Sequence, residues 1–295
     1  MEMKTKAILQ VIIVLMAGVA VTILSSDGFA KNIESYDDGE PHAISIDGVE
    51  PTRENILNGT YPIQRNLVLC TMGEPEGDAK AFLDWILSPE GQTIVSEEFI
   101  PMSSEDAPVP GEPSDGAVVR VGGSTSIQQT MMLLAEAYMM KHPGVTVTVQ
   151  GGGSGAGASG TINGTLDIGM CSRDLKKSEL EKGLVPTYMG VDAVVAIVNG
   201  AGVDGVTMEQ LARLFNGDYD HWSDIGGGER PVAVVSREDG SGTRECFDNA
   251  MSAAVDGWEL KEYCVTFNNT GGVINMVNSA KGSIGYISIG QLNNL

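Results

Sequence analysis

The chain has 295 residues, of which 42% are hydrophobic and 19% are charged, and this balance is typical of a globular protein with one or two domains. Its formal net charge is −21 and its sequence pI is about 4.3. Nucleic acids and anionic membrane surfaces bind to basic faces, so this acidic composition excludes both as partners. Any site for an anion must therefore rely on local backbone dipoles and on one or two arginines.

Residues 1–30 have the layout of a secretory signal peptide. Lys4 and Lys6 precede an apolar run over residues 7–24, and small residues follow up to Ala30, after which we expect cleavage. The apolar run is also long enough to span a bilayer, so an uncleaved N-terminal membrane anchor is the alternative. In both cases we expect the body of the protein to be extracytoplasmic, in the periplasm or at the cell surface.

Cysteine and histidine usage indicates neither a disulfide framework nor a metal site. Four cysteines are too few for a disulfide framework, and a single bond between Cys246 and Cys264 is the pairing that the sequence leaves open. We expect Cys70 and Cys171 to be reduced and to lie at strand ends as small apolar residues. The three histidines lie far apart without the spacing of metal ligands, so no metal and no cofactor are expected.

The first half of the chain is expected to hold two strands, one long helix and a linker. The expected elements are a strand at 43–46, a turn region at Pro51, a strand at 64–70, a helix at 77–94 interrupted near Pro89, and an exposed acidic linker at 102–116. Prolines and charges mark the linker because they disfavour both regular structure and burial.

From residue 117 onward, strands alternate with helices, as in an α/β protein whose parallel sheet is covered on both faces. Thr207 and Gln210 stand in the positions of a capping box, which predicts the start of an amphipathic helix. The expected strands are at 118–121, 145–150, 167–170, 187–189, 193–198, 232–237 and 283–287, and the expected helices are at 127–141, 207–215 and 273–280.

Three valine-rich runs each end in a loop of glycine, serine and threonine that leads into a helix-like stretch. The loops begin at Gly122, Gly151 and Glu238. Each loop puts backbone N–H groups and hydroxyls at a helix N-terminus, where unpaired donors and the helix dipole favour an anion. Serine and threonine in a single such turn are more often helix caps than ligands, but three loops at the carboxyl ends of strands favour one small oxyanion.

The motifs at these loops resemble those of the phosphate-binding proteins that serve ABC-type phosphate transporters. The motifs are Gly123-Ser-Thr-Ser126, Gly151-Gly-Gly-Ser154-Gly, Asp167-Ile-Gly-Met-Cys-Ser-Arg173, His221-Trp-Ser-Asp-Ile-Gly-Gly227, Ser236-Arg-Glu-Asp-Gly-Ser-Gly-Thr243 and Gly282-Ser-Ile-Gly-Tyr-Ile-Ser288. The resemblance implies an α/β, two-lobed periplasmic-binding-protein-like (type II) fold in which two strands cross the hinge between the lobes. We place the crossing strands at residues 63–70 and 193–199.

Two segments that precede the linker resemble the C-terminal end of the same family. They are Ile44-Ser-Ile-Asp-Gly-Val-Glu-Pro-Thr52 and Leu83-Asp-Trp-Ile-Leu-Ser-Pro-Glu-Gly-Gln92. The chain therefore resembles a circular permutant in which the usual tail has moved to the front and the acidic linker joins the usual end to the usual beginning.

The permutation predicts how the two lobes are divided along the chain. Residues 31–64 and 196–295 are expected to form lobe 2, and residues 65–195, including the linker, are expected to form lobe 1. The permuted chain is expected to be a monomer. The alternative is a product of two tandem gene copies that completes itself by exchanging residues 42–102 with a second copy, which would make it an obligate dimer.

The resemblance implies an anion site in the cleft between the lobes. Lobe 1 is expected to supply Thr125, Ser126, Ser154, Ser172 and Arg173, and lobe 2 is expected to supply Arg237, Ser241, Gly242 and Thr243. Closure of the cleft removes water, which strengthens these contacts and makes Arg237 a forked, charge-assisted donor. We expect Asp239 to hold Arg237 rigid.

One departure from the family pattern concerns the choice of anion. Many members have an aspartate directly after the serine of the third motif, where it accepts a proton from phosphate and so rejects sulfate. Here Arg173 follows Ser172, and the nearest carboxylate is one residue later. Our hypothesis is that Asp192, just before the strand at 193–198, supplies the acceptor; the alternative is a structural aspartate in a turn ahead of that strand.

These features predict a solute-binding protein that captures inorganic phosphate and delivers it to the membrane permease subunits of an ABC importer. An enzyme is not expected, because the loop at Gly151 lacks the lysine of a nucleotide P-loop and Ser241 lacks the spacing of a nucleophile elbow. The alternatives are an anchored sensor that reports phosphate to a membrane partner, and a protein of the same fold that binds sulfate, molybdate or tungstate.

Overall fold

The computed structural model describes residues 40–102 and 107–295, and these residues belong to one compact unit. The expected signal peptide or anchor at residues 1–30 lies outside the described residues, as does part of the linker, residues 103–106. Within the described ranges, no helix has both the length and the apolar composition that a membrane crossing requires.

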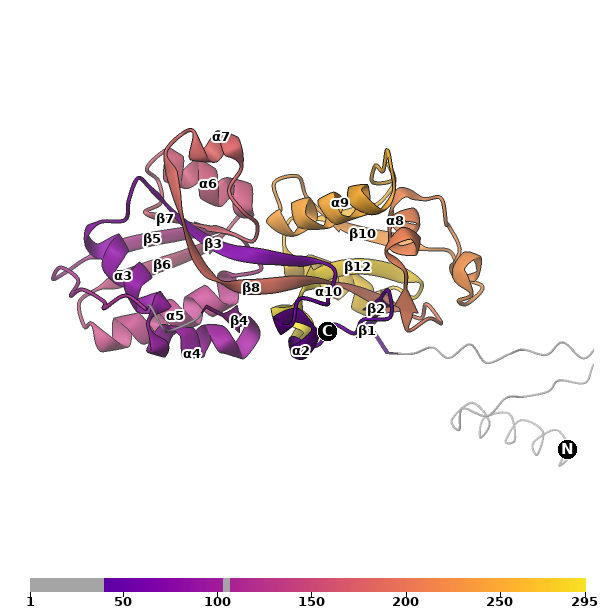
Figure 1. Cartoon of the computed structure of the whole chain (residues 1–295), viewed down its shortest axis with the longest axis horizontal. Helices are drawn as coiled ribbons and strands as arrows, with labels where there is room; N and C mark the ends of the chain where they lie inside the picture. The colour runs from indigo at the N-terminus through magenta and orange to yellow at the C-terminus, as the bar shows by residue number, and fades with distance from the viewer. Residues whose placement is uncertain (1–39, 103–106) are drawn as a thin grey trace, which may run out of the picture. The chain divides into compact units, whose positions relative to one another are not determined.

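Strands and helices alternate along most of the chain (Figure 1). The strands are β1 (His42–Ala43), β2 (Ser45–Ile46), β3 (Gln64–Met72), β4 (Ile100–Pro101), β5 (Val118–Gly123), β6 (Thr146–Gly151), β7 (Ile168–Cys171), β8 (Leu184–Asn199), β9 (Gly205–Val206), β10 (Ala233–Arg237), β11 (Val265–Phe267) and β12 (Ser283–Ser288). The helices are α2 (Arg53–Leu57), α3 (Gly77–Leu87), α4 (Pro89–Glu98), α5 (Gln128–Lys141), α6 (Ser154–Ile162), α7 (Lys177–Leu180), α8 (Met208–Asn216), α9 (Gly242–Ala254) and α10 (Thr270–Ser279), with 3-10 helices η1 (Trp222–Ile225) and η2 (Ile289–Asn294).

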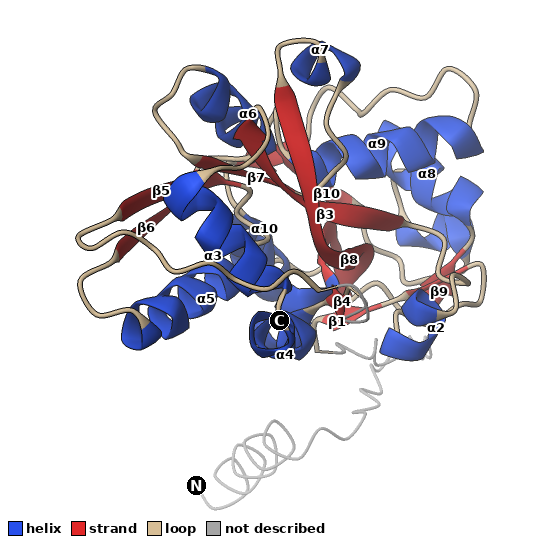
Figure 2. Cartoon of the chain, turned by 60° about the vertical axis from the view of Figure 1, so that its left-hand side comes forward, coloured by secondary structure: helices blue, strands red, loops and turns tan. Residues whose placement is uncertain are grey.

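The principal sheet is mixed, whereas the sequence predicted a parallel one. Its strand order is β11-β10-β12-β8-β3-β7-β5-β6, with β1 and β4 also paired to β8. The pairs at both ends of this order are parallel, but β8 is antiparallel to β12 and to β3, and β3 is antiparallel to β7. Figure 2 shows β3 and β8 among the strands drawn in red. The centre of the sheet is antiparallel because β8 runs opposite to both of its neighbours, β12 and β3, and β3 also runs opposite to β7.

Two large apolar cores lie on this framework, and we name the parts of the molecule after them. Lobe 1 is the part packed around the core that includes Leu67, Phe82, Trp85, Tyr138 and Met189. Lobe 2 is the part packed around the core that includes Ile63, Ala193, Phe215, Trp222 and Tyr286. β8 contributes to both cores, and β3 contributes to the core of lobe 1 shortly after Ile63, which belongs to the core of lobe 2, so both segments pass from one lobe to the other (Figure 1). This is the α/β, type II periplasmic-binding-protein-like fold with two crossing strands that the sequence predicted.

The second crossing strand differs from its predicted form. Residues 187–189 and 193–198 were expected as separate pieces, but β8 runs without a break over sixteen residues. Its first part pairs with β3, with a register shift at Met189, and its last part pairs with β12, so the strand has a pairing partner at both ends. The crossing lies between Met189 and Ala193, which belong to different cores, and therefore just before the predicted range 193–199.

Helix caps and backbone hydrogen bonds explain where the strands and helices of residues 42–98 begin and end. The expected break near Pro89 is confirmed: α3 ends and α4 begins around Ser88, whose hydroxyl donates to Trp85 O (2.6 Å) and caps α4. The strand expected at 43–46 is divided into β1 and β2, because the backbone N–H of Ile44 bonds to Ala196 while that of Ser45 bonds to Asp204. The turn region at Pro51 also contains α2, which Thr52 caps.

The capping box of α8 is confirmed, since Thr207 Oγ1 accepts from Gln210 N (3.1 Å) and Gln210 Oε1 accepts from Thr207 N (2.8 Å). All four cysteines are free, so the bond between Cys246 and Cys264 that the sequence left open is not present. Cys70 and Cys171 are buried on β3 and β7, as expected.

Candidate anion-binding site

The three glycine-rich loops do lead from strands into helix N-termini. β5 leads to α5, β6 leads to α6, and β10 leads to α9. Ser154 is the first residue of α6, and Ser241 caps α9 by accepting from Arg244 N (3.3 Å). Each helix therefore begins beside a hydroxyl group, with backbone N–H groups that have no partner inside the helix.

The hydroxyls of lobe 1 contact one another in the protein interior. Ser172 Oγ accepts from Ser124 Oγ (3.0 Å) and lies 3.4 Å from Ser154 Oγ, while Ser172 N donates to Ser154 Oγ (3.1 Å). All three side chains are buried. Ser124 was not among the predicted residues, although its place between Gly123 and Thr125 in the first loop could have suggested it.

Lobe 2 closes directly on these hydroxyls. Ser126 Oγ lies 2.9 Å from Thr243 Oγ1, and Gly155 N donates to Gly240 O (3.0 Å). A Cβ atom on Gly242 would lie 2.4 Å from Ser154 Oγ, so only glycine allows the first turn of α9 to approach so closely. Below, "hydroxyl cluster" means Ser124, Ser126, Ser154, Ser172 and Thr243. The structure thus brings together four of the predicted hydroxyl residues, Ser126, Ser154 and Ser172 of lobe 1 and Thr243 of lobe 2.

Arg237 is buried beside this cluster, but a different carboxylate holds it. Arg237 Nε and Nη2 donate to the two carboxylate oxygens of Glu238 (2.9 and 3.0 Å). Asp239, which was expected to do this, is exposed and instead lies 2.7 Å from Arg244. The expectation for Asp239 was wrong because the chain turns at this point, so that the neighbouring carboxylate faces the guanidinium.

The remaining donors of Arg237 join both lobes. Nη2 donates to Thr125 Oγ1 (3.1 Å) in lobe 1, and Nη1 donates to Thr270 Oγ1 (3.2 Å) at the start of α10. Thr270 was not predicted, and the Asn269 cap that precedes it is the signal that could have located this helix start.

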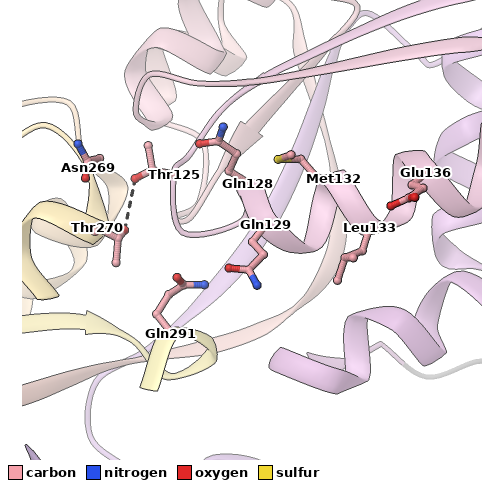
Figure 3. A pocket seen from close by; sticks show the side chains of 10 residues that line it. Thr125, Gln128, Gln129, Met132, Leu133, Glu136, Asn269, Thr270 and Gln291 are labelled. Atoms are coloured by element: carbon pink, nitrogen blue, oxygen red, sulfur yellow. Dashed lines mark hydrogen bonds between the residues drawn. The ribbon is translucent and has the colours of Figure 1, made fainter. Parts of the chain in front are cut away.

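Thr125 and Thr270 also form the inner wall of an open cavity of about 490 Å³ (Figure 3). Their hydroxyl oxygens lie 3.3 Å apart, as the dashed line marks. The other lining residues come from α5, the start of α10 and η2: Gln128, Gln129, Met132, Leu133, Glu136, Asn269, Gly271 and Gln291. The pair of threonines therefore separates this cavity from Arg237.

Arg173 is turned toward acidic side chains rather than toward the hydroxyl cluster. Its Nη1 and Nη2 atoms donate to the two oxygens of Glu179 (2.9 and 2.8 Å), and its Nε atom lies 2.9 Å from Glu245 of α9. Burial opposes the ionisation of Glu179, but the bonds from Arg173 and from Lys176 N prevail and lower the pKa of this carboxyl. No contact joins the Arg173 guanidinium to the cluster among the contacts of the described residues.

Asp192 lies within β8 and not in a turn ahead of a strand, so the turn alternative was wrong. Its Oδ2 atom accepts from Arg65 Nε (2.8 Å) and Nη2 (2.6 Å), and its Oδ1 atom accepts from Ser288 Oγ (2.8 Å) and Ile289 N (3.3 Å). Sequence reasoning missed Arg65. A single arginine inside the apolar run of a predicted strand was the signal that could have found it.

The chemistry of this arrangement suits a small oxyanion. It offers hydroxyls, helix N-terminal N–H groups and a guanidinium, and each buried arginine of the site is already balanced by a carboxylate. In residues 40–102 and 107–295, no three histidine, cysteine, aspartate or glutamate side chains are grouped so that they could hold a metal ion.

Known proteins with similar sequences and folds share this architecture. The PBP superfamily domain matches residues 109–295. Phosphate-binding protein PstS 2 of Streptococcus agalactiae serotype V is 33% identical over 212 residues, which make up 70% of this chain and 72% of that protein.

Two solved structures are similar as well. One is a phosphate ABC transporter substrate-binding protein with bound phosphate from Clostridium perfringens, with a TM-score of 0.54, 34% identity, and coverage of 58% of this chain and 70% of that chain. The other is a phosphate-binding protein of a phosphate ABC transporter from Streptococcus pneumoniae, with a TM-score of 0.52, 30% identity, and coverage of 68% of this chain and 76% of that chain. The chain therefore belongs to the PBP superfamily and, within it, to the family of the phosphate-binding proteins named PstS.

Proposed function

We propose that the protein binds inorganic phosphate between its lobes and delivers it, outside the cytoplasmic membrane, to the permease subunits of an ABC importer. The observation that carries this proposal is the close approach of the first turn of α9 to the buried serines of lobe 1. Relatives of this chain are named phosphate-binding proteins, and the C. perfringens structure contains bound phosphate.

The phosphate ligands in this proposal are hydroxyls, N–H groups and one arginine. Lobe 1 supplies Thr125, Ser126, Ser154 and Ser172, and lobe 2 supplies Arg237, Ser241, Gly242 and Thr243. A hydroxyl both donates and accepts, so the hydroxyls that bond one another in the structure can exchange these bonds for bonds to phosphate oxygens. Arg173 is left out as a direct ligand because Glu179 and Glu245 engage its guanidinium.

Binding and closure are coupled in this arrangement. An anion that touches both lobes binds the closed form better than the open form, and it shifts the population toward closure by that difference in affinity. The cross-lobe bonds of Arg237 to Thr125 and of Ser126 to Thr243 belong to the closed form. The permease would then recognise a closed, loaded protein.

The preference for phosphate over sulfate depends on a proton acceptor, for which we propose Asp192. Its carboxylate oxygens accept bonds from Arg65, Ser288 and Ile289, so it would have to exchange one of these for a phosphate hydroxyl. Calorimetry with both anions tests this role in Asp192→Asn. Weaker phosphate binding with unchanged sulfate binding would support it, whereas an unchanged preference for phosphate would exclude it.

We further propose that the chain is a circular permutant, with its lobes divided as predicted except at the boundary after residue 195. Ala193, Val194 and Val195 belong to the core of lobe 2, so lobe 1 ends before residue 193. The match to the superfamily domain begins at residue 109, within the linker, and leaves residues 42–102 outside. Those residues nevertheless supply β3 at the centre of the sheet and side chains to both cores. A segment that is essential to the fold but outside the collinear match is what a permutation produces.

Ligand-dependent melting of the purified protein tests the main proposal. A ligand at about a hundredfold excess over its Kd stabilises the folded state by about 2.7 kcal/mol. For a chain of this size that stabilisation raises Tm by roughly 5–10 °C. Phosphate is expected to produce such a rise, and sulfate and molybdate a smaller one. A Tm that does not respond to phosphate would refute the proposal, and a larger rise with sulfate or molybdate would reassign the ligand.

A further inference from the structure

The crossing strands carry a buried ion pair. Arg65 of β3 and Asp192 of β8 are register partners on antiparallel strands. Their side chains are 2% and 0% exposed, and the shortest contact between them is 2.6 Å, from Nη2 to Oδ2. A pair so completely removed from water requires that its remaining hydrogen-bonding groups also find partners.

One of these groups finds no partner among the described residues. In residues 40–102 and 107–295, the buried Arg65 Nη1 has no hydrogen-bond partner, whereas Nε and Nη2 both donate to Asp192. Both oxygens of Asp192 are used, because Ser288 and Ile289 occupy the second one. An unpaired N–H of a buried guanidinium is costly, and such groups mark places where something else is bound.

Arg65 lies close to the hydroxyl cluster. Thr243 and Cys246 occupy successive turns on one side of α9, and one helical turn advances about 5.4 Å. Thr243 Oγ1 contacts Ser126 in the cluster, while Cys246 Sγ lies 3.8 Å from the carbonyl oxygen of Gln64, the residue before Arg65. Burial raises the pKa of the Cys246 thiol to about 11, and the nearby positive charge of Arg65 opposes this rise.

A second path leads from Arg65 to Arg237. Asp192 accepts from Ser288, at the end of β12. Two residues earlier on the same face of β12, the Tyr286 hydroxyl lies 3.3 Å from the backbone N–H of Arg237 and accepts from it. The pair is thus connected to both sides of the candidate site.

We infer that Arg65 is a second anion-binding arginine, whose Nη1 group donates to an oxygen of the bound oxyanion. Asp192 Oδ2 then also positions this arginine, because it accepts from Nε and Nη2 and fixes the direction of Nη1, while Oδ1 is the oxygen left for the proton-acceptor role proposed above. The inference rests on the proposed binding of phosphate. It also explains why an arginine and an aspartate are buried at the crossing, where an apolar pair would pack at lower cost.

Calorimetry with phosphate on three variants tests the inference. Arg65→Lys keeps the charge but cannot direct separate donors to Asp192 and to the anion, so phosphate affinity should fall at least about tenfold. The double variant Arg65→Gln, Asp192→Asn removes both charges together and leaves no unpaired buried ion. It should melt near wild type and still bind phosphate at least about tenfold more weakly.

Arg120→Lys is the control, since Arg120 also pairs with an aspartate through Nε and Nη2, in this case with both oxygens of Asp167 in lobe 1 (Nε to Oδ2, 3.0 Å; Nη2 to Oδ1, 2.7 Å). It should leave phosphate affinity unchanged. If the double variant binds phosphate as tightly as wild type, the pair is only structural and the inference is wrong.

The outcomes separate this inference from the proposed function. If the wild-type protein does not bind phosphate, both fail. If it binds phosphate and the Arg65 variants bind equally well, only the inference fails. A crystal structure of the wild-type protein with phosphate decides the matter even if the variants do not fold: Nη1 within about 3.2 Å of a phosphate oxygen supports the inference, and a distance beyond hydrogen-bond range overturns it.

Discussion

At the scale of single residues, the site is made of hydroxyls whose partners are other hydroxyls. Ser154 illustrates this, because its Oγ atom accepts from Ser172 N and contacts Ser172 Oγ across 3.4 Å. Such an arrangement carries little net charge. It can therefore be buried without an anion and can exchange its bonds when an anion enters.

Ser154→Ala is expected to weaken phosphate binding about tenfold, because a donor to the anion is lost. Stability should fall by only about 1 kcal/mol, the cost of leaving Ser172 N without its acceptor. Calorimetry and thermal melting measure the two effects. Ser159→Ala is the control, since Ser159 is exposed on the same helix. Equal phosphate affinity in both variants would remove Ser154 from the site.

Because Glu98 is partly buried, the free energy of unfolding is expected to depend on pH. Desolvation raises the pKa of this carboxyl above its usual value of 4.5, although the Thr130 hydroxyl, which donates to it across 2.6 Å, opposes the rise. The folded state therefore binds more protons than the unfolded state between the two pKa values. The free energy of unfolding must decrease as the pH rises through that interval.

Glu98→Gln removes this titration while keeping an acceptor for Thr130. The variant and the wild type should have similar melting temperatures near pH 4, and the variant should melt at the higher temperature at pH 7. Thermal melts across this range provide the measurement. If the melting temperature of the wild type rose relative to that of the variant as the pH increases, the raised pKa would be contradicted.

At the scale of elements, an ionic contact joins α9 of lobe 2 to the segment that precedes α7 of lobe 1. Glu245 lies 2.9 Å from Arg173 Nε and 2.9 Å from Lys176 Nζ. The contact exists only when the lobes approach each other. It should therefore stabilise the closed form without touching the ligand.

Glu245→Gln is expected to weaken phosphate binding by about two- to fivefold, since partly exposed ion pairs contribute about 0.2–1 kcal/mol. This loss of affinity should become smaller at high salt. It should result from faster dissociation of phosphate rather than from slower association. Stopped-flow kinetics at two ionic strengths measures both. Glu209→Gln is the control, because Glu209 pairs with Arg213 inside the single helix α8. A salt-independent change would argue against an electrostatic contact between lobes.

The elements also show where sequence reasoning succeeds and where it stops. The capping box at Thr207 and the break at Ser88 were predictable, because each depends on residues within four positions of each other. The unbroken course of β8 was not predictable. The sequence predicted a brief extended piece after Pro186 and a separate apolar run from Ala193, but pairing with β3 on one part and β12 on the other holds the strand together.

At the scale of the whole molecule, the proposed permutation concerns the order of segments along the chain. Residues 42–102 precede the linker in sequence, yet they supply a central strand of the sheet and part of each core. Permutation leaves these contacts unchanged, since it alters only the connections between elements.

A rearranged chain with residues 42–102 placed after Leu295 through a short linker should fold as a monomer and bind phosphate with the same Kd. Light scattering and calorimetry on the original and rearranged chains make the comparison. The original chain is also expected to be monomeric. An obligate dimer would instead support exchange of residues 42–102 between two copies.

The crossing strands followed from the family resemblance. The sequence by itself was enough for the α/β class, the three loops that lead into helices, and the serines and threonines at their ends. These depend on apolar runs, glycines and caps, which act over a few neighbouring residues. Only the tertiary structure decided which carboxylate each arginine meets: Glu238 for Arg237, Glu179 and Glu245 for Arg173, and Asp192 for Arg65. Arg65 and Asp192 are 127 positions apart, and nothing local to either residue specifies the other. Their contact is created by the pairing of β3 with β8, because backbone hydrogen bonds bring distant segments into register and burial then requires that opposite charges meet.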